Sequence, residues 1–140
     1  MATARRVACI DEKESLIFET VFPSEEKINF LLRAKKTGYF IRLFFIGTNS
    51  PTINASRVAK RVLENGHDVP IQKIITRYYK SIANCAIIST LVDRLYVYDN
   101  SVDDSPANLL FRSSNGVLTK QYSEISEWAI PIYGSLNTDI

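Results

Sequence analysis

Histidine and cysteine are scarce in this sequence, and their scarcity removes whole classes of function. His67 is the only histidine, and Cys9 and Cys85 are the only cysteines among 140 residues. A zinc site built from Cys and His therefore lacks a fourth ligand, and any catalytic triad has to use His67. Both cysteines fall on expected apolar faces, which indicates small core side chains in a reducing compartment.

A strong net charge and long apolar runs are also missing. The chain has seventeen Lys and Arg residues and fifteen Asp and Glu residues, so its formal net charge is only +2. This charge argues against a dedicated duplex-binding protein. No apolar run approaches the roughly 20 residues of a membrane span, and residues 1–10 lack the apolar core of a signal peptide. We expect one cytoplasmic domain over residues 1–140, with neither nucleic acid nor a membrane as partner.

Apolar segments alternate with amphipathic ones along the chain. Spacing and capping residues predict helices over residues 2–13, 24–37 and 51–65. A longer helix is predicted after Pro70, with an apolar stripe at Ile71, Ile74, Ile75, Tyr78, Ile82 and Cys85. Apolar runs predict strands over 16–20, 39–46 and 95–98. Residues 109–122 read as a hairpin that turns at Asn115-Gly116. Because strands and helices alternate, the order predicts an α/β fold: a mainly parallel sheet with right-handed crossovers and flanking helices, plus a C-terminal hairpin.

Polar residues follow each expected strand, at Glu19-Thr20, Thr48-Asn49-Ser50 and Asp99-Asn100-Ser101. Ligands collect at the carboxyl ends of parallel strands, so these residues are candidate binding groups. The alternative is that they are ordinary turns, in which short polar side chains cap backbone groups. Glu19 differs, because a carboxylate after a buried strand is costly to desolvate unless it has a partner or a task.

A basic segment lies between Arg57 and Lys80, where six basic residues face two acids. Arg57 and Arg61 are four apart on one expected helix, and Arg77 lies with two lysines on the polar face of the next. Guanidinium groups on such a helical hairpin can hold phosphate oxygens in a fork geometry. A solvated helix face is the alternative interpretation.

Several of these residues, taken in order, resemble a known family. They include Arg57-Val58-Ala59-Lys60-Arg61-Val62, Asn65-Gly66-His67-Asp68-Val69-Pro70, Arg77-Tyr78-Tyr79-Lys80-Ser81 and Tyr98-Asp99-Asn100-Ser101, with Phe18-Glu19-Thr20 before them. This combination resembles the P-loop ATPases or kinases related to the zeta toxins, over about residues 2–101. The resemblance implies a P-loop kinase-like sheet and a lid-like helical region over residues 51–92.

The family resemblance also implies an activity and roles for individual residues. Zeta toxins use ATP and Mg²⁺ to phosphorylate a hydroxyl, which in characterised members is a sugar hydroxyl of UDP-N-acetylglucosamine. By this resemblance Glu19 and Thr20 face the substrate, and Arg57, Arg61 and Arg77 are catalytic residues that neutralise the transferring phosphate. Asp99, Asn100 and Ser101 would lie near the nucleotide. A phosphorylated small molecule and an antitoxin-like protein are the implied partners.

The sequence departs from that family at the ATP site. Its five glycines are Gly38, Gly47, Gly66, Gly116 and Gly134, and none of them precedes a lysine. There is no G-x-x-x-x-G-K-[S/T] motif, so we expect the chain neither to bind ATP and Mg²⁺ tightly nor to catalyse transfer.

The missing P-loop strand of the family would lie between the strands at 16–20 and 40–46. Either the chain is part of a longer kinase, or those two strands pair directly. The alternative function is a non-catalytic derivative that binds a nucleotide, a phosphosugar or a protein. The exposed strand edge at 40–46 predicts pairing with a second copy of the chain.

Overall fold

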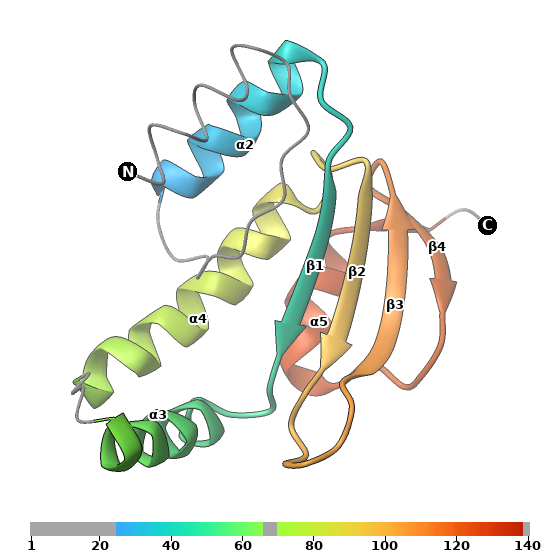
Figure 1. Cartoon of the computed structure of the whole chain (residues 1–140). Helices are drawn as coiled ribbons and strands as arrows, with labels where there is room; N and C mark the ends of the chain where they lie inside the picture. The colour runs from blue at the N-terminus through green and yellow to red at the C-terminus, as the bar shows by residue number, and fades with distance from the viewer. Residues whose placement is uncertain (1–24, 66–69, 139–140) are drawn as a thin grey trace.

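The computed structural model describes residues 25–65 and 70–138 (Figure 1). Its helices are α2 (Glu25–Thr37), α3 (Pro51–Asn65), α4 (Ile71–Ile88) and α5 (Ile130–Gly134), with a 3₁₀ turn η1 (Glu127–Ala129) before α5. Its strands are β1 (Arg42–Gly47), β2 (Arg94–Asp99), β3 (Asn108–Ser114), β4 (Val117–Gln121) and β5 (Asn137–Thr138). The helix expected at 2–13 and the strand expected at 16–20 lie outside the described residues.

The sheet is mixed, so the expectation of a mainly parallel, P-loop kinase-like sheet is wrong. Its strands lie in chain order, β1-β2-β3-β4-β5. Strands β1 and β2 are parallel, β2-β3 and β3-β4 are antiparallel, and the two-residue β5 runs parallel to β4. Short loops rather than helices join β2, β3 and β4, and such loops connect antiparallel neighbours. The C-terminal hairpin was expected beside the sheet, but it belongs to it.

Several local expectations are confirmed. Helix α3 begins at Pro51 directly after the capping Ser50, whose Oγ accepts a hydrogen bond from Thr52 N at 3.1 Å. The hairpin turns at Asn115-Gly116, where φ is +49° and +80°, values that suit an Asn-Gly pair. Most of the apolar stripe expected on α4 is buried, namely Ile74, Tyr78, Ile82 and Cys85, and Ile88 joins it. Ile71, at the start of the helix, is exposed instead.

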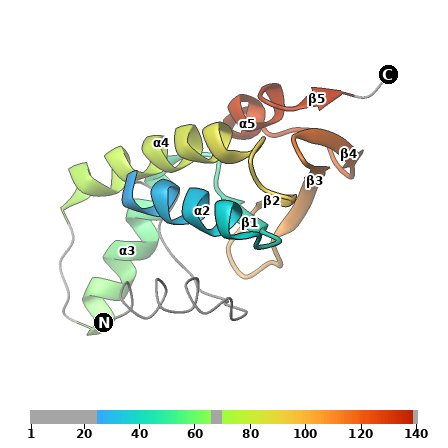
Figure 2. The same ribbon diagram turned by 90° about the horizontal axis from the view of Figure 1, so that it is seen from above.

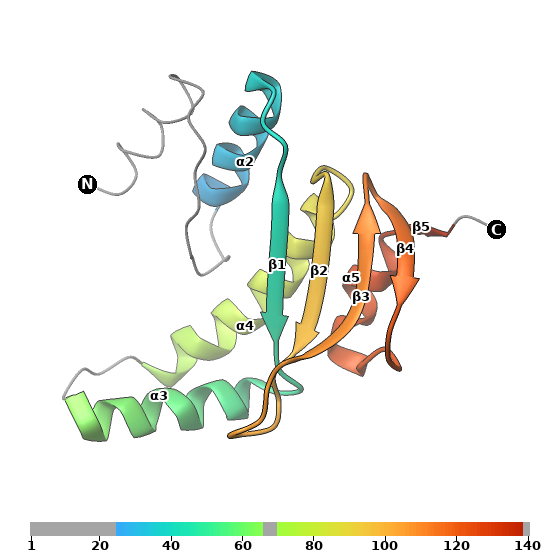
Figure 3. The same cartoon turned by 45° about the vertical axis from the view of Figure 1, so that its right-hand side comes forward.

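Helices cover one face of the sheet and leave the other open. Figures 2 and 3 show α4 and α5 together on one side, and in Figure 3 no described helix crosses the front of β1, β2 and β3. The core lies between sheet and helices, where Leu95, Val97, Phe111 and Ile132 are fully buried. Burial alternates along β1 and β2, so Phe44 and Ile46 on the open face stay more than half exposed.

One glycine allows the two layers to approach closely at the end of β1. A Cβ placed on Gly47 would overlap the ring of Trp128, which packs from the segment before α5. A Cβ placed on Gly134 would meet nothing within 4 Å. Gly47 is therefore required by the packing of Trp128.

We predict that Gly47→Ala lowers the free energy of unfolding by about 1–3 kcal/mol, because the added methyl group overpacks the Trp128 contact. Gly134→Ala is the matched control and should leave stability unchanged or raise it by up to about 1 kcal/mol, since alanine favours helix. Urea unfolding followed by Trp128 fluorescence measures both. Equal stability of the two variants would contradict this packing.

Candidate functional site

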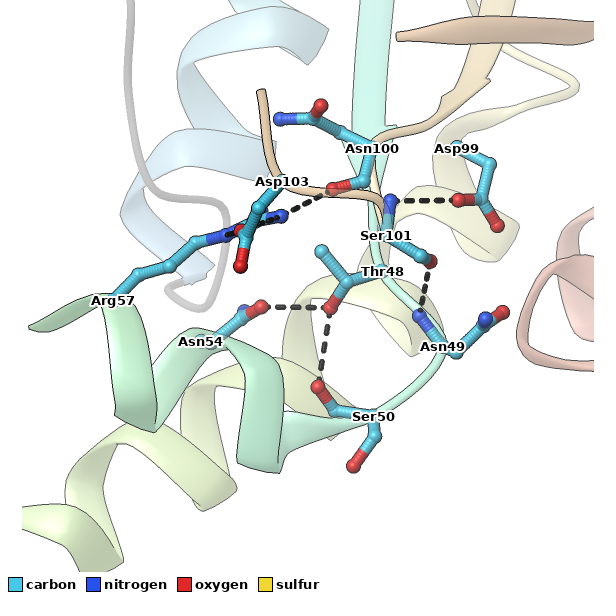
Figure 4. A network of polar contacts seen from close by, with 9 residues as sticks. All are labelled: Thr48, Asn49, Ser50, Asn54, Arg57, Asp99, Asn100, Ser101 and Asp103. Carbon is cyan, nitrogen blue, oxygen red and sulfur yellow. Dashed lines mark hydrogen bonds and ion pairs between the residues drawn. The ribbon is translucent and has the colours of Figure 1, made fainter. Parts of the chain in front are cut away.

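The carboxyl ends of β1 and β2 meet at one edge of the sheet, where Gly47 is in register with Asp99. The backbone continues this pairing beyond the strands, because Asn100 N donates to Gly47 O at 2.8 Å. The loop after β1 and the loop after β2 consequently lie side by side, as Figure 4 shows. Helix α3 starts from the same edge and supplies further polar groups.

The loop after β1 is fixed by its own short polar side chains. Thr48 is buried, and its hydroxyl donates to Asn54 Oδ1 of α3 at 2.7 Å, with the Ser50 carbonyl at 3.2 Å as a second acceptor. Asn49 N donates to Ser101 Oγ at 2.9 Å, which joins the two loops. These contacts support the turn interpretation of residues 48–50.

Helix α4 reaches this loop through one phenol. Tyr78 Oη donates to the Thr48 carbonyl at 2.7 Å, and the ring is buried. Burial, together with the nearby Tyr79 and Asp99, raises the pKa of Tyr78 above its ordinary value, so the hydroxyl keeps its proton and remains a donor. Tyr78 therefore connects α4 to the end of β1 as well as packing in the core.

Asp99 links the β2 end to the C-terminal segment. Its Oδ1 accepts from Ser101 N at 2.8 Å, and its Oδ2 accepts from Ser126 Oγ at 2.9 Å and from Trp128 Nε1 at 2.7 Å. Burial raises the pKa of the Asp99 carboxyl, but the hydrogen bonds from Ser101, Trp128 and Ser126 outweigh burial and leave the pKa below its ordinary value. These bonds engage both carboxylate oxygens, so Asp99 organises the edge rather than offering a free ligand.

Arg57 lies across the loop after β2. Its Nη2 donates to the Asn100 carbonyl at 2.8 Å, and its Nε donates to Asp103 Oδ1 at 3.0 Å (Figure 4). Arg57 is 27% exposed and Asp103 is 78% exposed, so the ion pair contributes little to stability. Its effect is positional, since it holds the Arg57 side chain at the edge where β1 and β2 end.

The remaining residues expected at the site do not all lie at the edge where β1 and β2 end. Arg61 and Arg77 are exposed on α3 and α4, and within residues 25–65 and 70–138 no hydrogen bond or ion pair places them together. Asn100 and Ser101 contribute a carbonyl and a hydroxyl to the loop contacts already described. Glu19 and Thr20 lie outside the described residues.

Sequence reasoning missed Asp103 as the partner of Arg57, and Ser126 and Trp128 as partners of Asp99. A buried indole N–H needs an acceptor, and that requirement was the available signal. Nothing in the local sequence identified Asp99 as the acceptor, because 29 residues separate the two.

An open hollow of about 560 Å³ adjoins the other side of Asp99. Its lining combines hydroxyl, amide and apolar groups, among them Ser105, Asn108, Leu110 and Ser126. Among the described residues no three His, Cys, Asp or Glu side chains gather as metal ligands. None of the described helices combines the length and apolar composition that a bilayer crossing requires.

The chain was compared with known proteins at three levels. No family model, curated protein or solved structure matches it.

We predict that Asp99→Asn lowers the free energy of unfolding by about 1–3 kcal/mol at neutral pH, because charge-assisted bonds to Ser101 and Trp128 are lost. The folded-state pKa of Asp99 lies below its ordinary value of 3.8. The carboxylate therefore stabilises the fold above that value, and its contribution disappears as the pH falls through the folded-state pKa.

Asp104→Asn is the control, because it removes the same charge from an exposed loop residue outside the network. Urea unfolding between pH 2 and pH 7, followed by Trp128 fluorescence, compares the variants. Relative to this control, Asp99→Asn should show a weaker rise of stability with pH in the acid range. Parallel pH profiles for the two variants would contradict the role of Asp99.

Proposed function

We propose that the chain is the substrate-side and lid part of a zeta toxin-like phosphotransferase, and that it binds a phosphorylated small molecule of the nucleotide-sugar class. The observation that carries this proposal is the position of Arg57, held by Asp103 and the Asn100 carbonyl where β1 and β2 end. In α/β sheets ligands bind beyond the carboxyl ends of parallel strands, and β1 and β2 are a parallel pair whose carboxyl ends meet here. The resemblance over residues 57–101 supports the same location.

The connection between β1 and β2 supports the lid assignment. Helices α3 and α4 both lie in the connection between the parallel strands β1 and β2, and they carry Arg57, Arg61 and Arg77. Arg57 is fixed at the edge, while Arg61 and Arg77 are exposed on the same helical hairpin. In this proposal the two exposed arginines meet the phosphate only when the ligand is bound, and Arg57 positions the loop after β2.

The sequence lacks the motif that holds ATP and Mg²⁺ in the family it resembles. It contains no G-x-x-x-x-G-K-[S/T]. Positioning and charge neutralisation account for most phosphoryl-transfer catalysis, and the groups that provide them for the triphosphate are missing. We therefore propose binding without turnover by this chain, as a non-catalytic derivative would show.

The edge of β1 is the second feature to which we give a role. Among the described residues β1 has a strand neighbour only in β2, and an edge with free backbone groups accepts a further strand. A second copy of the chain or an antitoxin-like protein would supply that strand. This pairing leaves the Arg57 edge accessible, because that edge lies at the strand ends rather than along their length.

We predict that inorganic phosphate and UDP-N-acetylglucosamine bind weakly, with Kd of about 1 mM or weaker at low salt, because few charge-assisted contacts act at an exposed site. Arg61→Gln with Arg77→Gln should remove this binding and change stability by less than about 1 kcal/mol, since both residues are exposed. Titration followed by ¹H–¹⁵N spectra measures the affinity and the resonances that move.

Lys35→Gln with Lys36→Gln is the matched control, since it removes two exposed charges from α2. That variant should bind as the unaltered chain does. If both double variants lost binding equally, the binding would reflect general charge attraction rather than a site at Arg61 and Arg77. Mg²⁺-dependent ATP turnover by the pure chain, abolished by Arg77→Ala, would contradict the proposal of binding without turnover.

A further inference from the structure

The open face of the sheet carries aromatic and basic side chains in an ordered arrangement. We define the outer face as the positions of β1, β2 and β3 that point away from α4 and α5 (Figure 3). Its aromatic and basic members are Arg42, Phe44, Arg94, Tyr96, Tyr98 and Arg112. This face is separate from the edge that holds Arg57.

Strand register sets these side chains in rows across the sheet. Phe44 is in register with Tyr96, Tyr96 with Arg112, and Arg112 with Lys120 of β4. The rings of Phe44 and Tyr96 stack with centroids 4.9 Å apart and planes 11° from parallel. Phe44 is nevertheless 56% exposed, so its other face and its edge are open to solvent.

A second row combines one ring with two guanidinium groups. Arg42 is in register with Arg94, and both lie over the ring of Phe40, at 5.2 Å and 5.3 Å from its centroid. Phe40 is 55% exposed directly before β1. These cation–π contacts hold two planar, charged groups beside the stacked pair of the next row.

The charge of the outer face differs from that of the whole chain. Three arginines stand on it, Lys120 extends it, and none of the outer-face positions of β1, β2 and β3 holds an acid. The chain as a whole has a net charge of only +2. Adjacent cations repel one another, and a polyanion bound across the rows relieves that repulsion.

We propose that the outer face binds single-stranded nucleic acid. Exposed rings next to arginines are the groups that stack unpaired bases, and the surrounding cations contact the phosphates between those bases. A duplex hides the faces of its bases and gains nothing from the rings. A second copy laid face to face would bring like charges together. This proposal rests on local charge and ring placement, and it departs from the composition-based expectation that nucleic acid is not a partner.

Fluorescence anisotropy with a labelled eight-nucleotide RNA and the full chain tests this proposal. At about 50 mM salt the single strand should bind more tightly than a duplex of the same length, and its affinity should fall as salt rises. Phe44→Ala with Tyr96→Ala should weaken binding about tenfold or more through lost stacking. Phe44→Tyr with Tyr96→Phe keeps both rings and should retain the affinity of the unaltered chain.

Variants that remove the same number of charges from different surfaces distinguish binding at the outer face from general electrostatic attraction. Arg42→Gln with Arg94→Gln should weaken binding and reduce its salt dependence, whereas Lys73→Gln with Lys80→Gln, on the exposed face of α4, should change neither. Equal loss in both variants, equal or tighter duplex binding, or no binding by the unaltered chain would overturn the proposal. A dimer that Phe44→Ala with Tyr96→Ala dissociates, with no RNA bound, would assign the face to a second copy instead.

Discussion

The Asp99 carboxylate is the group on which the organisation of the β1–β2 edge depends. It ends β2, accepts from the backbone of Ser101, and accepts from Trp128, whose ring packs against Gly47 at the end of β1. One partly buried charge thereby joins the parallel pair, the loop after β2 and the C-terminal segment. Donors to both carboxylate oxygens offset the cost of removing that charge from water. The lowered pKa of Asp99 reflects the same contacts.

The two faces of the sheet have different chemistry. The inner face meets α4 and α5 through aliphatic and aromatic packing. The Arg57 edge follows from how α3 and α4 connect β1 to β2. The outer face keeps stacked rings and arginines in solvent. A sheet covered on both faces carries apolar residues on both. The outer face of β1 and β2 carries rings beside charged groups instead, which suits an exchangeable partner better than a permanent layer.

The sequence predicted local structure well and long-range structure less well. The cap at Ser50-Pro51, the Asn115-Gly116 turn and the apolar stripe of α4 follow from neighbours along the chain, and the structure agrees with each. The predicted strand directions were wrong because the alternation of helices and strands along the chain ends at β2. The contacts of Asp99 with Trp128 and of Arg57 with Asp103 join residues 29 and 46 positions apart, and no local pattern reports such pairs.

Asp99 holds the loop that carries the Asn100 carbonyl and Asp103, and through this loop it positions Arg57. The side-chain Nε–H resonance of Arg57 is sensitive to that position. In the unaltered chain this proton should give a distinct signal protected from solvent exchange, because it donates to Asp103. In Asp99→Asn at neutral pH the signal should move towards that of an exposed arginine and exchange faster. An unchanged signal in that variant, with the fold intact, would contradict the account.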